Sequence, residues 1–209
     1  MRILLFVTIF GLLLSGSGPA AAETILRADC RVVLEEERQE LYAVALELDL
    51  ARSELVAAEE VYGLLDRLWK NDATERLRYL SGKHQRDVAS IGVERLGARL
   101  EQQEALIEQY RLICDAVKRT EDDRGAIDRA WQRYRVAECE VYGRDVAMAE
   151  VDLAYRLEVL ASFQDLREHD VATRQDIVYS ERDVEMARKQ LTQAKRLVDA
   201  CREELGGKK

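Results

Sequence analysis

Apolar residues recur at alternating steps of three and four along most of this chain. That spacing places them on one face of a helix and is typical of long helices that pack side by side as coiled coils. We term each apolar line a seam. Four seams follow one another, from Cys30 to Trp69, from Ala89 to Val117, from Cys139 to Phe163 and from Ile177 to Leu205. The polar residues Glu37 and Gln103 occupy positions in the first two seams.

The breaks between the seams are short and carry residues that begin helices. Asp72 with Glu75, and Thr173 with Asp176, have the spacing of a capping box, in which paired side chains satisfy free backbone amides at a helix start. Connections this short force consecutive helices to run antiparallel. We therefore expect hairpin turns at Asp72 and near Thr173.

No segment shows the strict alternation of a half-buried strand. We predict an all-α chain, an elongated array of four antiparallel helices that run up, down, up and down as two coiled-coil hairpins. The first hairpin is expected at residues 23–119, a turn at 120–126 ("TEDDRGA"), the second hairpin at 127–205 and a disordered tail at 206–209. Helices of about 45 residues would reach roughly 65 Å at 1.5 Å per residue.

The first 22 residues have the three parts of a secretory signal peptide. Arg2 precedes an apolar run over residues 3–14, and the small residues Ala20 and Ala22 are spaced for cleavage before Glu23. The run is shorter than the ~20 residues that a membrane-spanning helix needs, and no later segment approaches that length. We expect a periplasmic or secreted protein with no transmembrane segment after signal cleavage.

The net charge of the chain limits the classes of partner it can bind, and its proline content favours long helices. The formal net charge of -8 becomes -9 when Arg2 leaves with the signal peptide, and acidic and basic residues are interspersed. Nucleic-acid binding calls for a basic patch, so we expect no nucleic-acid partner. The only proline, Pro19, also lies in the signal peptide, which leaves a mature chain suited to long uninterrupted helices.

All four cysteines lie on the seams, and in an exported protein an even number of cysteines indicates disulfides. The midpoint between Cys30 and Cys114 is the turn at position 72, and the midpoint between Cys139 and Cys201 is position 170, at the other predicted turn. Helix register therefore favours the pairs Cys30–Cys114 and Cys139–Cys201. The rival pairing, Cys114 with Cys139 and Cys30 with Cys201, needs an axial slip of several residues and stays open.

Other candidate chemistry is sparse. Four thiols at one level of a bundle would be a metal or iron–sulfur site, but the sequence has no CxxC pair. His84 and His169 stand beside turns, where we expect them to be solvent-exposed. Catalytic carboxylates need a shared pocket, and nucleophile, phosphate-loop and metalloprotease motifs are absent from the sequence. We expect no catalytic residue, no cofactor, no metal site and no enzymatic activity.

Two stretches resemble a known family. "RYLSGKHQRDVASIGVERLGARLEQQ" (78–103) and "LREHDVATRQDIVYSERDVEMARKQLTQAKRLV" (166–198) are similar to the helical hairpins of the outer-membrane efflux (TolC-like) family, in which a turn with Gly and a following Asp opens a long helix. Gly82 and Asp87 match in the first stretch; Asp170 replaces the Gly and Asp176 keeps its place in the second. The resemblance covers under half of the mature chain. It implies a periplasmic helical barrel whose tips meet an adaptor protein, and also outer-membrane strands, which this chain lacks.

The resemblance moves the first turn toward Gly82, whereas the cysteine register favours Asp72, and this alternative stays open. In either case the tips are the candidate partner contacts. They comprise Trp69, Tyr79, Leu80, Gly82, His169 and Asp170.

The sequence thus predicts a non-enzymatic, exported coiled-coil structural or interaction module of the cell envelope, a soluble relative of efflux-channel helical domains, that meets a protein partner. Assembly of several copies is left open. The alternative is a periplasmic chaperone-like binder, which would hold unfolded proteins in an exposed apolar concavity.

Overall fold

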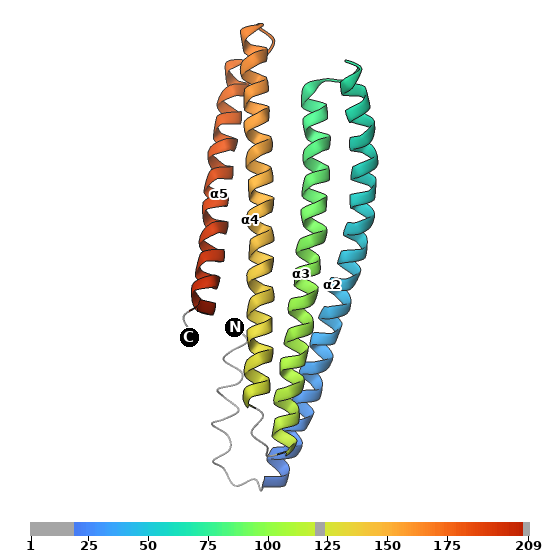
Figure 1. Cartoon of the computed structure of the whole chain (residues 1–209), viewed down its shortest axis with the longest axis vertical. Helices are drawn as coiled ribbons and strands as arrows, with labels where there is room; N and C mark the ends of the chain where they lie inside the picture. The colour runs from blue at the N-terminus through green and yellow to red at the C-terminus, as the bar shows by residue number, and fades with distance from the viewer. Residues whose placement is uncertain (1–18, 120–123, 207–209) are drawn as a thin grey trace.

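A computed structural model describes the backbone of residues 19–119 and 124–206, and the side chains of residues 30–115 and 125–206 (Figure 1). The described chain folds into four helices: α2 (Pro19–Lys70), α3 (Arg76–Arg119), α4 (Arg124–Glu168) and α5 (Arg174–Gly206). No strand occurs among these residues. The predicted all-α array of antiparallel helices is confirmed.

The four helices form an open row. Extensive packing occurs between α2 and α3, between α3 and α4, and between α4 and α5, so each helix packs on its neighbours in sequence (Figure 1). Among the described residues, no comparable packing occurs between the edge helices α2 and α5. An edge helix therefore has one covered face, whereas α3 and α4 are covered on two sides.

The buried positions of the edge helices follow the predicted seams. Val44, Leu48 and Leu65 are buried on α2, and Val184 and Val198 are buried on α5. Because these residues belong to seams whose positions recur at steps of three and four, each edge helix presents one apolar line to its neighbour.

The inner helix α4 buries a different line from the predicted one. Its buried apolar residues are Ala130, Ala137 and Val141, and none of them belongs to the seam that begins at Cys139. The predicted seam faces α5, as the Cys139–Cys201 contact shows, whereas the buried line lies against α3. A helix between two neighbours needs two apolar lines, and small alanines on the second allow close approach to α3.

The first turn lies at residues 71–75, at Asp72 and not at Gly82. Asp72 has a φ of 53°, in the left-handed region. Ala73 N–H donates to the Leu68 carbonyl at 2.8 Å, and Asp72 N–H donates to the Trp69 carbonyl at 3.0 Å. These two bonds form a Schellman motif, which satisfies the last free carbonyls of a helix. Asp72 therefore ends α2, and the predicted capping box that begins α3 with Asp72 and Glu75 is wrong.

The second turn repeats this motif. Asp170 has a φ of 57°. Val171 N–H donates to the Leu166 carbonyl at 2.9 Å, and Asp170 N–H donates to the Arg167 carbonyl at 3.0 Å.

The capping box after the second turn is present as predicted. Thr173 N–H donates to Asp176 Oδ2 at 2.8 Å, and Asp176 N–H donates to Thr173 Oγ1 at 3.2 Å. The Thr173 hydroxyl also donates to Asp176 Oδ2, at 2.6 Å, and this bond together with the one from Thr173 N–H favours the charged carboxylate and lowers the pKa of Asp176. Thr173 thus fixes the first residue of α5.

Several predicted boundaries differ from the structure. Helix α4 begins at Arg124, so the last three residues of the predicted 120–126 turn are helical, since turn residues are also accepted in a first helical turn. Helix α5 includes Gly206, the first residue of the predicted tail. Helix α2 begins at Pro19, inside the predicted signal peptide, whose residues 1–18 lie outside the described residues.

Candidate functional site

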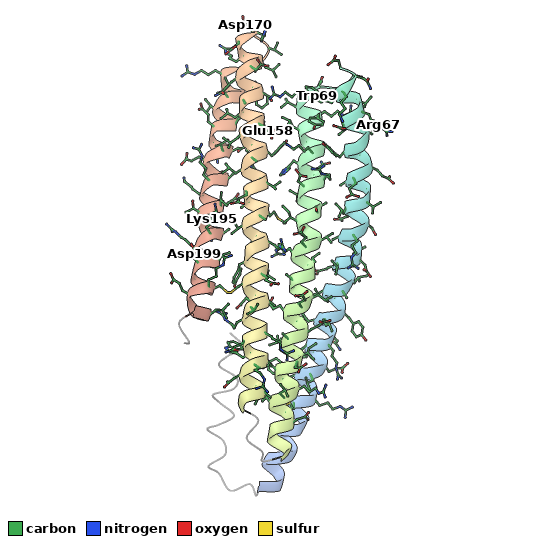
Figure 2. All side chains as sticks on the ribbon, in the orientation of Figure 1. Arg67, Trp69, Glu158, Asp170, Lys195 and Asp199 are labelled. Atoms are coloured by element: carbon green, nitrogen blue, oxygen red, sulfur yellow. A yellow bond between two sulfur atoms is a disulfide. The ribbon has the colours of Figure 1, made fainter. Side chains whose placement is uncertain are left out.

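Trp69 and Tyr79, two of the predicted tip residues, belong to an aromatic cluster beside the first turn. The Trp69 ring stacks on Tyr79 with centroids 5.5 Å apart. The Tyr79 hydroxyl lies 3.3 Å from the hydroxyl of Tyr62, and the Arg86 guanidinium lies 4.2 Å above the Tyr62 ring. The hydrogen bond with Tyr62, together with burial, raises the pKa of Tyr79 to about 12. The cluster ties α2 to α3, while Trp69 remains partly exposed at the tip (Figure 2).

Leu80 and Gly82 are inside the molecule. The Leu80 side chain is 5% exposed and lies between α3 and α4. Gly82 faces α2, and a Cβ at this position would overlap the Leu65 side chain. Neither residue offers a surface to a partner in this conformation, and both hold the helices together.

His169 and Asp170 lie at the turned end of the second hairpin, where Figure 2 labels Asp170. Both are exposed, and His169 Nδ1 lies 2.9 Å from the Asp165 carbonyl. The predicted tip residues therefore form two separate groups, one on each hairpin, and not one patch.

The structure forms the disulfides Cys30–Cys114 and Cys139–Cys201, the two pairs that the helix register predicts. The Cα atoms are 5.8 Å and 5.7 Å apart, within the range of an unstrained bridge. Each bridge closes one hairpin, and no free cysteine remains.

The two disulfides lie at different levels of the row. The ion pair between Arg95 and Asp145 sets the register of α3 on α4. In that register Cys139 is level with residue 101 of α3, 13 residues from Cys114, or about 20 Å along the axis. The four sulfurs therefore do not gather at one level.

His84 was expected to be exposed, but it lies between α3 and α4. Its side chain is 21% exposed, and its ring stacks on Tyr155 with centroids 4.2 Å apart. Nε2 lies 3.8 Å from Asp152 Oδ1, whereas Nδ1 is buried with no hydrogen-bond partner among the described residues. Burial is the largest influence on His84 and lowers its pKa.

A small pocket of about 60 Å³ adjoins the His84 ring. Leu80, Lys83 and Asp87 line it from α3, and Tyr155 and Glu158 line it from α4. It is too small for an organic ligand, since such sites usually measure several hundred Å³.

The outer face of α2 carries a second apolar line, which we term the outer stripe. From Tyr42 to Leu50 and from Ala57 to Leu64 its residues recur at steps of three or four on the side opposite the α3 contact, and a ten-residue step separates Val32 from Tyr42. The three most exposed are Tyr42 (76%), Leu46 (63%) and Leu50 (58%). The stripe comprises Val32, Tyr42, Leu46, Leu50, Val56, Ala57, Val61 and Leu64.

An acidic row follows the outer stripe along one edge of α2. Glu40, Glu47 and Glu54 recur at seven-residue spacing. Arg99 of α3 donates to Glu40 at 2.8 Å and to Glu47 at 3.3 Å, so two carboxylates share one guanidinium. Over residues 30–70, ten acidic and five basic residues give a formal charge of -5.

A broad groove between α3 and α4 carries more charged residues than the outer stripe. Glu101, Glu104 and Glu108 line it from α3, and Arg129 and Arg133 line it from α4, with a few small apolar residues between them. Arg133 donates to Glu108 at 3.1 Å. Six of the ten residues that line the groove are charged.

The described residues contain no group of three or more His, Cys, Asp or Glu side chains placed to hold a metal ion. Within the same part of the chain, no helix has a stretch long and apolar enough to cross a membrane.

Comparison with known proteins found no matching family model, no matching curated protein and no matching solved structure. The resemblance to TolC-like helical hairpins therefore stays a prediction.

Sequence reasoning missed the outer stripe and the position of His84. The stripe was visible in the sequence, because Leu50, Ala57 and Leu64 recur at seven-residue spacing in addition to the predicted seam. The contact of His84 with Tyr155 depends on the register of α3 on α4, which the predicted middle turn did not define closely enough.

Proposed function

We propose that this protein is an exported, non-enzymatic coiled-coil interaction module of the cell envelope, which binds a helix of a protein partner along the outer stripe of α2. The observation that carries the proposal is that α2 has two apolar lines, of which α3 covers only one.

The outer stripe supports binding because a helix that is apolar on two sides normally has two neighbours. Single exposed apolar residues are common on protein surfaces, but eight exposed apolar residues gathered on one face of a helix are typical of an interaction site. From Val32 to Leu64 the stripe spans 33 residues, about 50 Å of helix. A second helix laid along it would cover this line in the same way as α3 covers the inner seam.

The charge of α2 indicates the chemistry of the partner. The acidic row lies between the inner seam and the outer stripe, where Arg99 of α3 pairs with Glu40 and Glu47. The charge of -5 over residues 30–70 exceeds what this one guanidinium offsets, so a helix on the outer stripe would meet an acidic surface. Complementary charges at such positions select partner and orientation. We therefore expect a partner helix with an apolar line flanked by Lys or Arg at seven-residue spacing.

Export is part of the proposal. The signal-like N-terminus and the two disulfides both support it, because disulfides persist in oxidising compartments and are rare in the cytosol. The chaperone-like alternative requires an apolar concavity, whereas six of the ten residues that line the groove between α3 and α4 are charged. We therefore favour the interaction module.

Site-specific photo-crosslinking in the producing cell tests the proposal. A photoreactive residue at Leu50 is expected to give one discrete crosslinked product, and the same residue at the exposed Arg188 of α5 is the matched control. Mass spectrometry then reads the sequence of the crosslinked segment, which should show an apolar line with flanking basic residues.

The variant pair Leu46→Asp and Leu64→Asp should remove the product without unfolding the chain, because both positions are exposed. Circular dichroism checks that the helices persist. The proposal is wrong if Leu50 and Arg188 crosslink alike, or if the Leu50 product survives both substitutions. A product formed only with a second copy of this chain would replace the proposed partner with self-assembly.

A further inference from the structure

The two hairpins are joined to each other without a covalent crosslink. Both disulfides lie within a hairpin, so the contact of α3 with α4 depends on side-chain packing and ion pairs. Among the described residues, the ion pairs across this contact include Arg133 with Glu108, Arg144 with Glu94, Arg95 with Asp145, and Lys83 with Glu158. The chain connects α3 to α4 only at one end of this contact, through residues 120–123.

His84 lies near the other end of the contact, where the hairpins turn. Its ring packs face to face on Tyr155, with 12° between the ring planes, and therefore links the two hairpins directly. The buried Nδ1 has no partner. The pocket described above adjoins the ring, so the packing here is incomplete.

The charged groups around His84 are already engaged. On α4, Asp152 accepts a hydrogen bond from Arg156 at 2.7 Å, and Arg156 also pairs with Asp183 of α5 at 3.2 Å. Glu158 of α4 pairs with Lys83 at 3.3 Å.

On α3, the carboxylate of Asp87 pairs with Arg86. Each carboxylate near the imidazole thus has a cationic partner of its own, and a charged His84 would have to share one.

We propose that His84 is an acid-sensitive joint between the two hairpins. Protonation of its imidazole loosens the contact of α3 with α4 at the turned ends, while the disulfide-closed hairpins stay folded. The inference is independent of the function proposed above.

The protonation chemistry of the His84 imidazole explains why acid weakens the contact of α3 with α4. In the neutral ring Nδ1 can be an acceptor without a proton, but in the imidazolium it becomes a donor that needs an acceptor in a buried position. Asp152 and Asp87 favour the charged ring, whereas burial and the Arg156 guanidinium disfavour it. Burial is the largest of these, so the pKa is lowered.

A lowered pKa means that the separated state binds a proton more readily than the closed state. The stability of the contact is complete above the ordinary histidine pKa of about 6.5 and is lost as the pH falls toward the lowered pKa. At pH 5.5 the equilibrium constant for closing the contact falls by at most about tenfold. This limit is reached when only the separated state binds the proton, with the ordinary pKa of a histidine.

Hydrogen exchange of the full chain with intact disulfides tests the inference. After correction for intrinsic exchange rates, amide protection in residues 80–90 and 148–160 should fall by up to about tenfold from pH 7.5 to 5.5. Protection in residues 100–112 should be unchanged. NMR titration of the imidazole should place the His84 midpoint below 6.5.

His84→Phe keeps an aromatic ring against Tyr155 and removes the titration, so its protection should not depend on pH in this range. If that variant does not fold, His84→Gln serves the same purpose. His169→Gln, at the exposed histidine, should behave as the wild type. The inference is overturned if the loss of protection persists in the His84 variant, if it is equal along the whole chain, or if the wild type shows none.

Discussion

Gln103 of α3 donates a hydrogen bond from Nε2 to Glu37 Oε2 of α2 at 2.7 Å, and the same nitrogen lies 3.1 Å from the Glu37 carbonyl. These are the two polar residues that occupy the first two apolar seams. Each is partly buried, and each satisfies the other. Two apparent faults in the coiled-coil pattern are therefore one matched pair, which fixes the axial register of α2 on α3.

The pair predicts a non-additive response to substitution. Gln103→Leu should lower the free energy of unfolding by about 1–2 kcal/mol, because it leaves the Glu37 carboxylate without its donor. Glu37→Leu with Gln103→Leu should recover this loss or exceed it, since two apolar residues complete the seam. Urea denaturation of the two single variants and the double variant measures the coupling. Additive losses would show that the bond contributes nothing specific.

Gly82 should be intolerant of a side chain. Gly82→Ala adds a methyl group that overlaps the Cδ1 atom of buried Leu65, so Leu65 must shift; after the helix-propensity gain of alanine, the net cost should be up to about 1–2 kcal/mol of stability. Gly92 of the same helix has no neighbouring atom where a Cβ would lie. Gly92→Ala should instead stabilise by about 0.5–1 kcal/mol through helix propensity. Thermal denaturation distinguishes the two, and a gain in both variants would contradict the close approach of α2 and α3.

Glycine at the positive-φ position of either turn should make the protein more stable. Asp72 and Asp170 hold positive φ values, a conformation that costs a non-glycine residue about 1 kcal/mol. Asp72→Gly and Asp170→Gly should each raise the free energy of unfolding by up to about 1 kcal/mol. The control Asp199→Gly, inside α5, should lower it by a similar amount. A loss at either turn would mean that the Asp side chain supplies a stabilising contact.

Each disulfide should stabilise its hairpin by about 4 kcal/mol, the chain-entropy value for loops of 84 and 62 residues. Replacing both cysteines of one pair by Ala removes one loop and leaves the other intact. Denaturation with and without reductant checks the size of each effect. A reductant that left the transition unchanged would show that helix packing alone holds the hairpins.

The sequence predicted the edge helices well, because each has one covered face. Val44, Leu48 and Val198 lie on predicted seams and are buried. The disulfide register followed from the same regularity, because the midpoint between paired cysteines coincides with a turn whether or not the capping residues are assigned correctly.

The rest depended on which helices become neighbours. A single seam cannot describe α4, which packs on both sides, so Ala130 and Ala137 were not recognised as core residues. Leu80 was taken as a tip residue because it follows a turn, but α4 covers it. Local spacing defines a helix and its faces, whereas the position of a face at the centre or the edge of a row is decided by contacts between distant segments.

Peptide mapping without reductant, on the protein isolated from its producing cell, tests whether two separately closed hairpins are exported. We expect a mature N-terminus at Glu23 and linked peptides containing Cys30 with Cys114 and Cys139 with Cys201. A peptide linking Cys114 to Cys139, free thiols at these positions, or a chain that retains residues 1–22 would contradict this expectation.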